Sequence, residues 1–173
     1  MKKAQLAIAS AVLAVVILIA LDAMGRIPGT SPGPPQAQRA PDFTLKDIYG
    51  HEFSLSDYRG KVVILDFFMI RCTPCKAQVA ELKKVLSEYG GQVVIISISV
   101  DPSDTVEALR DYASQNGMTW TVAKDTANLA DKYDIRAVPT LVIVDQDGYI
   151  RYRHVGLTSG DQLIEEVGEL LGS

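Results

Sequence analysis

The chain has two cysteines in 173 residues, Cys72 and Cys75, with two residues between them. A disulfide across so short a loop would stabilise the fold little, because the stabilisation grows with loop length. The spacing therefore indicates a redox pair or half of a metal site, with two inert core thiols as a third interpretation. Zinc normally needs two further Cys or His ligands, and the only histidines, His51 and His154, are predicted in a turn and a strand far from the pair. We accordingly predict no metal ligands.

The elements on either side of the pair favour redox chemistry. Residues Val62–Phe68 form an apolar run rich in β-branched residues, typical of a strand buried on both faces. Residues Cys75–Tyr89 have helical periodicity. Cys72 is therefore expected at a helix N-terminus, where unpaired N–H groups and the helix dipole stabilise a thiolate. Cys75, one turn into the helix, is near enough to attack the mixed disulfide that Cys72 would form.

Asp66 interrupts the apolar strand, six residues before Cys72. Burial disfavours a charged carboxylate and should raise its pKa, which suits Asp66 to carry a proton to or from Cys75 through a water molecule. A structural carboxylate, hydrogen-bonded in the core, is the alternative. Pro74 fits the first helical turn, because its missing N–H would have no intrahelical partner there.

The rest of the chain alternates predicted strands and helices. Strands are expected over residues 43–45, 53–55, 62–68, 93–100, 141–144 and 149–155, and helices over residues 75–89, 104–116, 128–133 and 159–171. Ser103 or Asp104 is the expected cap of the second helix, and Ser159 that of the last. The Asp147-Gly148 pair predicts a hairpin, and the sole tryptophan, Trp120, is expected in the core. Parallel and hairpin connections together predict an α/β fold with a central mixed β-sheet flanked by helices.

Residues 1–25 have the composition of a targeting signal. A basic start precedes an almost uninterrupted apolar run over residues 6–21, which indicates a signal anchor or a signal peptide. The run approaches the lower length limit for crossing a membrane, and the positive charges before it place the rest of the chain outside the cytoplasm. We expect a single-pass protein of the cell membrane with its domain outside, or a secreted one if cleavage occurs near residue 25.

The remaining sequence divides into a linker and one domain. Residues 26–40 are rich in Pro and Gly, cannot build a core, and are predicted to form an extended linker. Residues 41–173 are regularly patterned and have the size of a single domain. The formal net charge of −4 argues against a nucleic-acid partner, which requires a basic face.

Several motifs of the domain occur together in one known family. They are Ala40-Pro41-Asp42-Phe43-Thr44-Leu45, Ser54-Leu55-Ser56-Asp57-Tyr58-Arg59-Gly60-Lys61, Asp66-Phe67-Phe68, Ser99-Val100-Asp101, Tyr133-Asp134-Ile135 and Val138-Pro139-Thr140. With the dithiol, they resemble the TlpA/ResA-type extracytoplasmic thioredoxin-like thiol–disulfide oxidoreductases. The resemblance extends from Pro41 to Leu171 and implies a thioredoxin-like fold with an N-terminal β-hairpin extension.

The resemblance also implies a function and roles for residues. Cys72 would be the nucleophile and Cys75 the resolving cysteine of an exchange with protein disulfides, with no cofactor besides their own disulfide. Pro139 would be a cis-proline facing the dithiol, and the Val138 backbone would pair with an extended substrate strand. Asp66 would take the place of the proton-transferring acid of thioredoxins. Substrates would be extracytoplasmic proteins, such as apocytochrome c or proteins with copper-site cysteines, and electrons would come from a CcdA/DsbD-like membrane protein.

A few positions next to the dithiol depart from the family pattern. Arg71 replaces the tryptophan that usually precedes the first cysteine, and its guanidinium would favour the Cys72 thiolate and attract an acidic partner. Thr73-Pro74 is not the commonest dipeptide between the cysteines, and Met69-Ile70 replace small, polar residues. We expect Arg71, Thr73 and Pro74 to contact the substrate. The motif leaves open whether the pair reduces or oxidises its substrate.

Two other functions share parts of this pattern. Sco-type copper-site assembly factors resemble the domain but use C-x-x-x-C and a distal histidine, and the spacing here is one residue shorter. His154 is expected to be a solvated residue of an edge hairpin and not a ligand. Thiol peroxidases of the peroxiredoxin type share the opening Pro-Asp-Phe-Thr-Leu motif but need a threonine three residues before the cysteine, where this chain has Met69.

Overall fold

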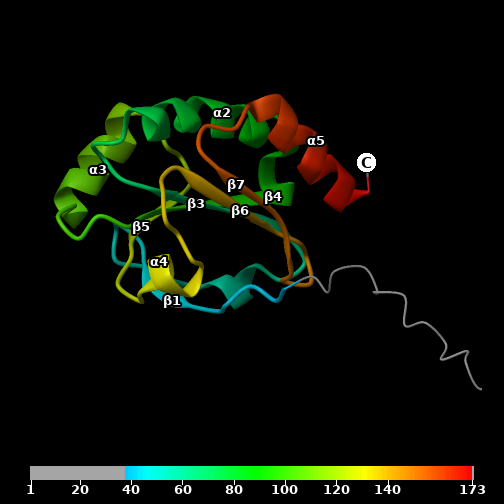
Figure 1. Ribbon diagram of the computed structural model, residues 1–173, viewed down its shortest axis with the longest axis horizontal. Helices are drawn as coiled ribbons and strands as arrows, with labels where there is room; N and C mark the ends of the chain where they lie inside the picture. The colour runs from blue at the N-terminus through cyan, green and yellow to red at the C-terminus, as the bar shows by residue number, and fades with distance from the viewer. Residues whose placement is uncertain (1–37, 173) are drawn as a thin grey trace, which may run out of the picture. The chain divides into compact units, whose positions relative to one another are not determined.

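The fold is known from a computed structural model that describes residues 38–172 (Figure 1). The predicted targeting segment and most of the predicted linker, residues 1–37, lie outside the described residues. Among residues 38–172, no helix combines the length and the hydrophobicity needed to cross a membrane.

A five-stranded mixed sheet forms the centre of the domain, in the strand order β5-β4-β3-β6-β7. Its strands are β3 (Val62–Phe68), β4 (Val93–Ser99), β5 (Thr121–Lys124), β6 (Thr140–Val144) and β7 (Ile150–Val155). Strands β3, β4 and β5 run parallel, whereas β6 pairs antiparallel with β3, and β7 antiparallel with β6. A separate antiparallel hairpin consists of β1 (Thr44–Lys46) and β2 (Glu52–Ser54). The predicted α/β class, mixed sheet and N-terminal hairpin are confirmed.

The helices cover the two faces of the sheet unequally. The helices α2 (Thr73–Tyr89), α3 (Val106–Gln115) and α5 (Gly160–Leu171) lie on one face, and the short α4 (Leu129–Lys132) lies on the other with β1 (Figure 1). The connections from β3 through α2 to β4 and through α3 to β5 step in one direction across the sheet. Because such crossovers are right-handed, both helices come to the same face. Two 3-10 turns, η1 (Leu55–Tyr58) and η2 (Gly90–Gln92), complete the elements.

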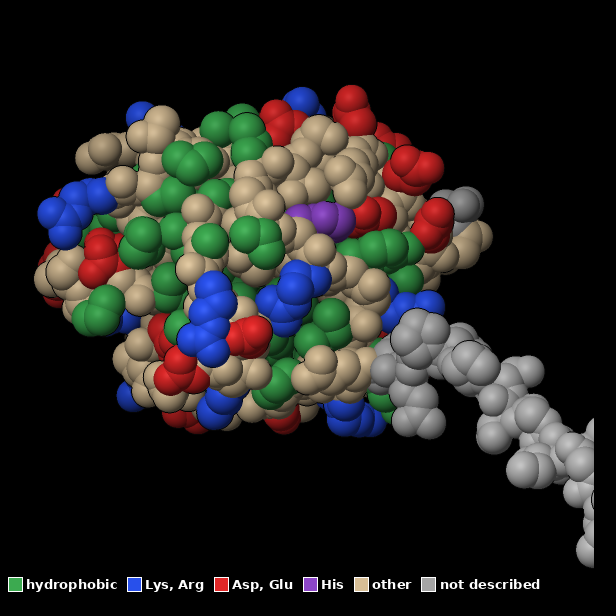
Figure 2. All heavy atoms as spheres, in the orientation of Figure 1, with side chains coloured by type: hydrophobic (Ala, Val, Ile, Leu, Met, Phe, Trp, Pro, Cys, Tyr) green, Lys and Arg blue, Asp and Glu red, His purple; other side chains and the backbone are tan. Residues whose placement is uncertain are grey.

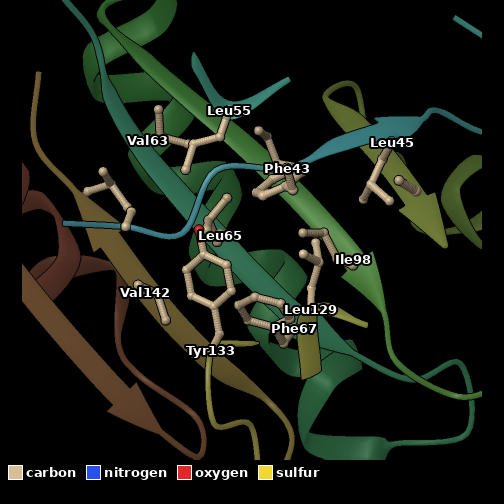
Figure 3. Close-up of a cluster of buried hydrophobic side chains, with 14 of the residues drawn as sticks. Phe43, Leu45, Leu55, Val63, Leu65, Phe67, Ile98, Leu129, Tyr133 and Val142 are labelled. Carbon is tan, nitrogen blue, oxygen red and sulfur yellow. The ribbon is translucent and has the colours of Figure 1, made fainter. Parts of the chain in front are cut away.

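Strand β3 contributes to the core on both faces of the sheet, because all seven of its residues are buried. Successive side chains point to opposite faces of a strand. Leu65 and Phe67 accordingly pack with Phe43 and Tyr133 under the face that α4 covers (Figure 3). Ile64 packs instead with residues of α2 and α5. Burial on both faces is the reason why the sequence of this strand is an almost uninterrupted apolar run.

Two details of the chain differ from the sequence-based expectation. No strand was expected between residues 117 and 127, yet Thr121–Lys124 forms β5, which pairs with β4. Only the two middle residues of β5 are buried, so its sequence has no periodic pattern, and the pairing with β4 makes it a strand. The N-cap of α3 is Thr105, whose Oγ1 accepts from the Ala108 N–H at 3.2 Å, and not Ser103 or Asp104.

The first described residues already belong to the domain. Ala40 is buried, and its N–H donates to the Gly148 carbonyl at 2.9 Å. Arg39 bridges to Tyr149, and the Ile150 N–H donates to the Gln38 carbonyl at 2.8 Å. The packing thus extends three residues into the segment assigned to the linker, through contacts with the turn between β6 and β7.

Candidate active site

Cys72 and Cys75 form a disulfide at the N-terminus of α2, with their Cα atoms 5.2 Å apart. Cys72 is the N-cap residue, and the Cys75 N–H donates to its Sγ at 3.1 Å. In the reduced pair, the same N–H and the positive end of the helix would stabilise a Cys72 thiolate. Cys72 is 9% exposed and Cys75 only 1%. The pair is therefore asymmetric, and Cys72 is the sulfur that a substrate can reach.

The loop before β6 lies directly beside Cys72. The Val138–Pro139 peptide bond is cis, as the resemblance implies. The Cys72 Sγ lies 3.8 Å from the Val138 carbonyl oxygen, so the dithiol and this loop meet. The Gly156 N–H donates to the Pro139 carbonyl at 2.8 Å, which ties the loop to the end of β7. Val138 is half-buried, and its backbone lies at the edge of the site.

Asp66 is a buried carboxyl group in β3, with 2% of its surface exposed. Its Oδ2 accepts from the Ser97 hydroxyl at 2.7 Å, and no described residue is hydrogen-bonded to its Oδ1. Burial raises the pKa of Asp66 to about 7, against the opposing effect of the Ser97 hydrogen bond. Asp66 points to the same face of the sheet as Phe68, which packs with both cysteines. It is thus a group able to exchange a proton near neutral pH at the dithiol end of the sheet.

A second hydrogen bond fixes how Ser97 meets Asp66. The Trp120 Nε1–H donates to the Ser97 Oγ at 2.9 Å. Since an indole N–H can only donate, the Ser97 hydroxyl hydrogen is left for Asp66. In this arrangement the Asp66 Oδ2 accepts from Ser97, which leaves Oδ1 for the acid proton of the neutral form. Ser97 was not among the predicted site residues. It is a polar residue inside the otherwise apolar run of β4, and this could have indicated a buried polar site, as Asp66 does in β3.

Tyr112 of α3 brings another buried polar atom to this region. Its ring stacks on Phe68 with the centroids 5.6 Å apart, and its hydroxyl has no hydrogen-bond partner among the described residues. Burial, and then the charges of Asp66 and Asp104, raise the pKa of Tyr112, so its hydroxyl stays protonated at physiological pH. Helical periodicity alone could not distinguish Tyr112 from an ordinary core residue.

Asp104 holds the loop that leads to Cys72. It is 5% exposed, and its Oδ2 accepts from the Ser99 hydroxyl at 2.6 Å and from the Ile70 N–H at 3.1 Å. The expected capping role for Asp104 is therefore replaced by a bond between the end of β4 and the loop after β3. This bond positions the residues just before the nucleophile.

Arg71 turns toward the loop after β4. Its Nη2 donates to the Ser103 hydroxyl at 3.2 Å, and the Ser103 hydroxyl and N–H in turn donate to Asp101. The hydrogen bonds from Ser103 lower the pKa of Asp101, and the charge of Arg71 adds to this effect, while desolvation opposes it. No described hydrogen bond joins Arg71 to Cys72. Thr73 and Pro74 are exposed on the first turn of α2, beside the disulfide.

His154 is not the solvated residue that the sequence suggested. Its side chain is 17% exposed, and its Nε2 lies 2.7 Å from the Glu166 Oε2 of α5. The reason is that α5 covers alternate residues of β7, so His154 lies under the helix while its neighbours Arg153 and Val155 are exposed. Among residues 38–172, no three His, Cys, Asp or Glu side chains gather as metal ligands would.

The amino-acid sequence is similar to those of known proteins. Residues 37–153 match the AhpC/TSA family. The chain is 30% identical over 135 residues to the thiol-disulfide oxidoreductase ResA of Halalkalibacterium halodurans, which covers 78% of this chain and 76% of that protein. It is 28% identical over 133 residues to the thioredoxin-like protein YneN of Bacillus subtilis, or 76% of this chain and 78% of that protein.

The structure also superposes on solved structures of other proteins. A putative thiol:disulfide interchange protein DsbE from Chlorobium tepidum superposes with a TM-score of 0.68 at 26% identity, covering 76% of this chain and 93% of that one. StoA from Bacillus subtilis, at 23% identity and a TM-score of 0.63, covers 73% of this chain and 96% of its own, and shows the shared fold. The chain therefore belongs to the AhpC/TSA family, and within it to the thiol–disulfide oxidoreductases of the ResA type, with a thioredoxin-like fold.

Proposed function

We propose that the protein reduces disulfides of proteins outside the cytoplasm, with Cys72 as the attacking and Cys75 as the resolving cysteine. The observation that carries the assignment of the two cysteines is the asymmetry of the pair. Cys72 is reachable at a helix N-terminus beside the cis-proline loop, whereas Cys75 is buried on the face of the sheet to which Asp66 points. Such an arrangement activates one sulfur and keeps the other from the substrate until the first has reacted.

The first step is attack by the Cys72 thiolate on one sulfur of the substrate disulfide. A Cys72–substrate disulfide forms, and the second substrate sulfur leaves as a thiolate. The Val138 backbone, beside Cys72, would hold the substrate as an extended strand. Arg71, Thr73 and Pro74 are exposed around the disulfide and would border this strand.

The second step releases the substrate. Cys75 gives its proton to the Asp66 carboxylate, directly or through a water molecule, and attacks the Cys72 Sγ. The Cys72–Cys75 disulfide forms, and the substrate departs with both sulfurs reduced, having received two electrons. Because burial raises the pKa of Asp66 to about 7, its carboxylate is a better base for a thiol than an ordinary aspartate.

The substrates and the electron source are also part of the proposal. ResA and DsbE, with which this chain shares its domain, are named as thiol-disulfide oxidoreductase and thiol:disulfide interchange protein. These names support thiol–disulfide exchange with proteins, and the predicted membrane-targeting segment supports a membrane-tethered protein. Apocytochrome c or proteins with copper-site cysteines are the substrates that the resemblance to the TlpA/ResA type implies. A CcdA/DsbD-like membrane dithiol would return two electrons to the Cys72–Cys75 disulfide after each cycle.

Two cysteine variants test the exchange chemistry. Cys72→Ser is expected to reduce the rate of insulin disulfide reduction to that measured without protein, because no reachable thiolate remains. Cys75→Ser should accumulate Cys72–substrate disulfides, which mass spectrometry of the trapped species would identify. If Cys72→Ser retained the wild-type rate, the assignment of the nucleophile would be wrong. If the trapped proteins carried no pair of cysteines for haem or copper, the exchange chemistry would stand and the proposed substrates would not.

The proposed location has its own measurement. A reporter enzyme that is active only outside the cytoplasm, fused after Ser173 of the full chain, should be active and should sediment with the membrane fraction. Activity in the soluble extracellular fraction would indicate a cleaved signal, and an inactive reporter would contradict the location.

A further inference from the structure

A hollow of about 440 Å³ lies on the face of the sheet opposite α2, between α4 and the edge strand β7. Its wall includes Ala137 and Thr140, the residues on either side of Val138 and Pro139. The hollow therefore adjoins the loop that faces Cys72, and one extended segment could contact both. Nothing in the exchange chemistry of the dithiol requires this hollow.

The rim of the hollow is basic. Lys132, Arg136 and Arg153 line it together with one carboxylate, that of Asp134. The Arg136 Nε lies 2.6 Å from the Asp134 Oδ1, in a pair that is about three-quarters exposed on both sides. Within residues 38–172, no carboxylate oxygen comes within 4.0 Å of Lys132 or Arg153. The chain as a whole has a net charge of −4, so the hollow carries the sign opposite to that of the protein.

The surface view shows the charged and apolar side chains of this region. In Figure 2, Lys and Arg side chains lie on the face over α4 and β7, interspersed with Asp and Glu side chains and next to hydrophobic ones. Val155 lines the hollow and is 68% exposed, and Leu157, two residues further along, is 55% exposed. Both flank Gly156, whose N–H is bound to the Pro139 carbonyl. Positive charge and exposed apolar surface thus lie together next to the cis-proline.

We propose that this hollow binds an acidic, extended segment of the substrate protein, next to the disulfide that Cys72 attacks. The inference rests on the proposed function and adds to it a preference for cysteines flanked by Asp or Glu. A strand that pairs antiparallel with the Val138 backbone continues past Ala137 toward Arg136. Its acidic side chains would meet Lys132 and Arg153, which have no described carboxylate partner, and its apolar side chains would meet Val155.

Charge also decides against a segment of this chain as the occupant. The chain enters the domain at Gln38, which lines the hollow, but residues 26–37 contain no Asp or Glu. A Pro- and Gly-rich stretch whose only charge is Arg26 does not complement a basic rim. An acidic segment of a partner does, and steering by such charges acts mainly on the rate of association.

The test uses three disulfide-containing peptides that are identical at the cysteines and flanked by Glu, Gln or Lys residues. The reduced full chain should reduce the Glu peptide with a kcat/KM about tenfold above that of the Lys peptide at low ionic strength, with the Gln peptide between them. Added salt should remove most of the difference. The double variant Lys132→Glu/Arg153→Glu should abolish or reverse the order, and Lys132→Gln/Arg153→Gln should give an intermediate one.

Lys83→Glu is the matched control, because it reverses an exposed charge on α2, on the opposite face of the sheet. It should keep the wild-type order of the three peptides. Equal rates for all peptides with wild type, or an equal loss of preference in Lys83→Glu, would overturn the proposed hollow. The equilibrium potential of the Cys72–Cys75 pair should be the same in every variant. A wild-type protein that reduced none of the peptides would instead overturn the proposed function.

Discussion

The two faces of the central sheet bury different kinds of side chain. On the face covered by α4, β3 and β4 contribute only apolar groups to the cluster around Phe67. The hydroxyls of Tyr133 and Thr140 on this face both donate to backbone carbonyls, so no polar atom of these two side chains is left over. On the face covered by α2 and α3, the same strands bury Asp66 and Ser97 near the cysteines.

Within one sheet, the buried side chains of one face therefore contribute to stability, and those of the other face contribute to the chemistry. The apolar face gains from burial and dispersion, and its cluster around Phe67 contains no carboxyl group. The other face includes a carboxyl group whose charged form is disfavoured by burial, and an orphan oxygen on it. Such a group lowers stability when ionised and is found where a protein needs a shifted pKa. We infer that variants of the buried apolar residues on the first face change stability alone, whereas variants of the buried polar residues on the second change titration.

The largest effect is expected from Phe67→Ala on the apolar face. Phe67 is fully buried, and its ring centroid lies 5.4 Å from that of Tyr133 (Figure 3). Removing the ring leaves a cavity and should lower the free energy of unfolding by about 3–5 kcal/mol. Denaturant unfolding of the oxidised protein measures the loss. The potential of the Cys72–Cys75 pair should remain that of wild type, and a changed potential would show that the two faces are coupled.

The next effect concerns Asp66→Asn and the pH dependence of stability. The folded pKa of Asp66 is about 7, above its ordinary value of 3.8, so the folded state binds more protons than the unfolded state between these values. Stability due to the neutral form is complete below pH 3.8 and is lost as the pH rises toward 7, by about 1.4 kcal/mol per pH unit. Asn keeps an acceptor for Ser97 but cannot ionise, so this slope should disappear.

The measurement is denaturant unfolding of wild type and Asp66→Asn at a series of pH values, with both proteins oxidised so that the cysteines do not titrate. Subtracting the two profiles removes the contribution of the other carboxylates. The free energy of unfolding of the variant, relative to that of wild type, should increase steadily from about pH 4 to about pH 7. Parallel profiles would mean that Asp66 has an ordinary pKa, and the contrast between the two faces would then be only one of composition.

Much of the fold and the dithiol follow from patterns that are local in sequence. The run over residues 62–68 predicts β3 with its observed bounds, because a strand buried on both faces needs an apolar residue at nearly every position. The helix N-terminus at Cys72 follows from the same boundary. β5 escaped prediction because its four residues become a strand only through pairing with β4. His154 was assigned wrongly because the packing of α5 over β7 is a tertiary contact.

The polar network was beyond the sequence for a related reason. Asp66 stands out, as a charge inside an apolar strand does, but the network around it comes from two other parts of the chain. Ser97 lies opposite Asp66 in the neighbouring strand, and Trp120 precedes the strand that no pattern predicted. The contact between these residues depends on the register of β3 against β4, which cannot be derived from a single sequence. Hollows beside the cis-proline loop likewise arise only once α4 and β7 are placed.

The smallest expected effect tests whether Trp120 orients Ser97. Trp120→Phe keeps an aromatic ring but removes the N–H that donates to the Ser97 Oγ, at a cost of about 1 kcal/mol in stability. The freed Ser97 hydroxyl should spend less time donated to Asp66, and since that hydrogen bond lowers the pKa of Asp66, the pKa should rise. Ser97→Ala should raise it further, and Ser99→Ala, which removes a hydroxyl bound to Asp104, should not change it. Carboxyl carbon NMR of the oxidised proteins reports this titration directly. A pKa of Asp66 that rises in Ser97→Ala but not in Trp120→Phe would show that Ser97 finds Asp66 without the indole, and that the buried polar face is organised by the strand register alone.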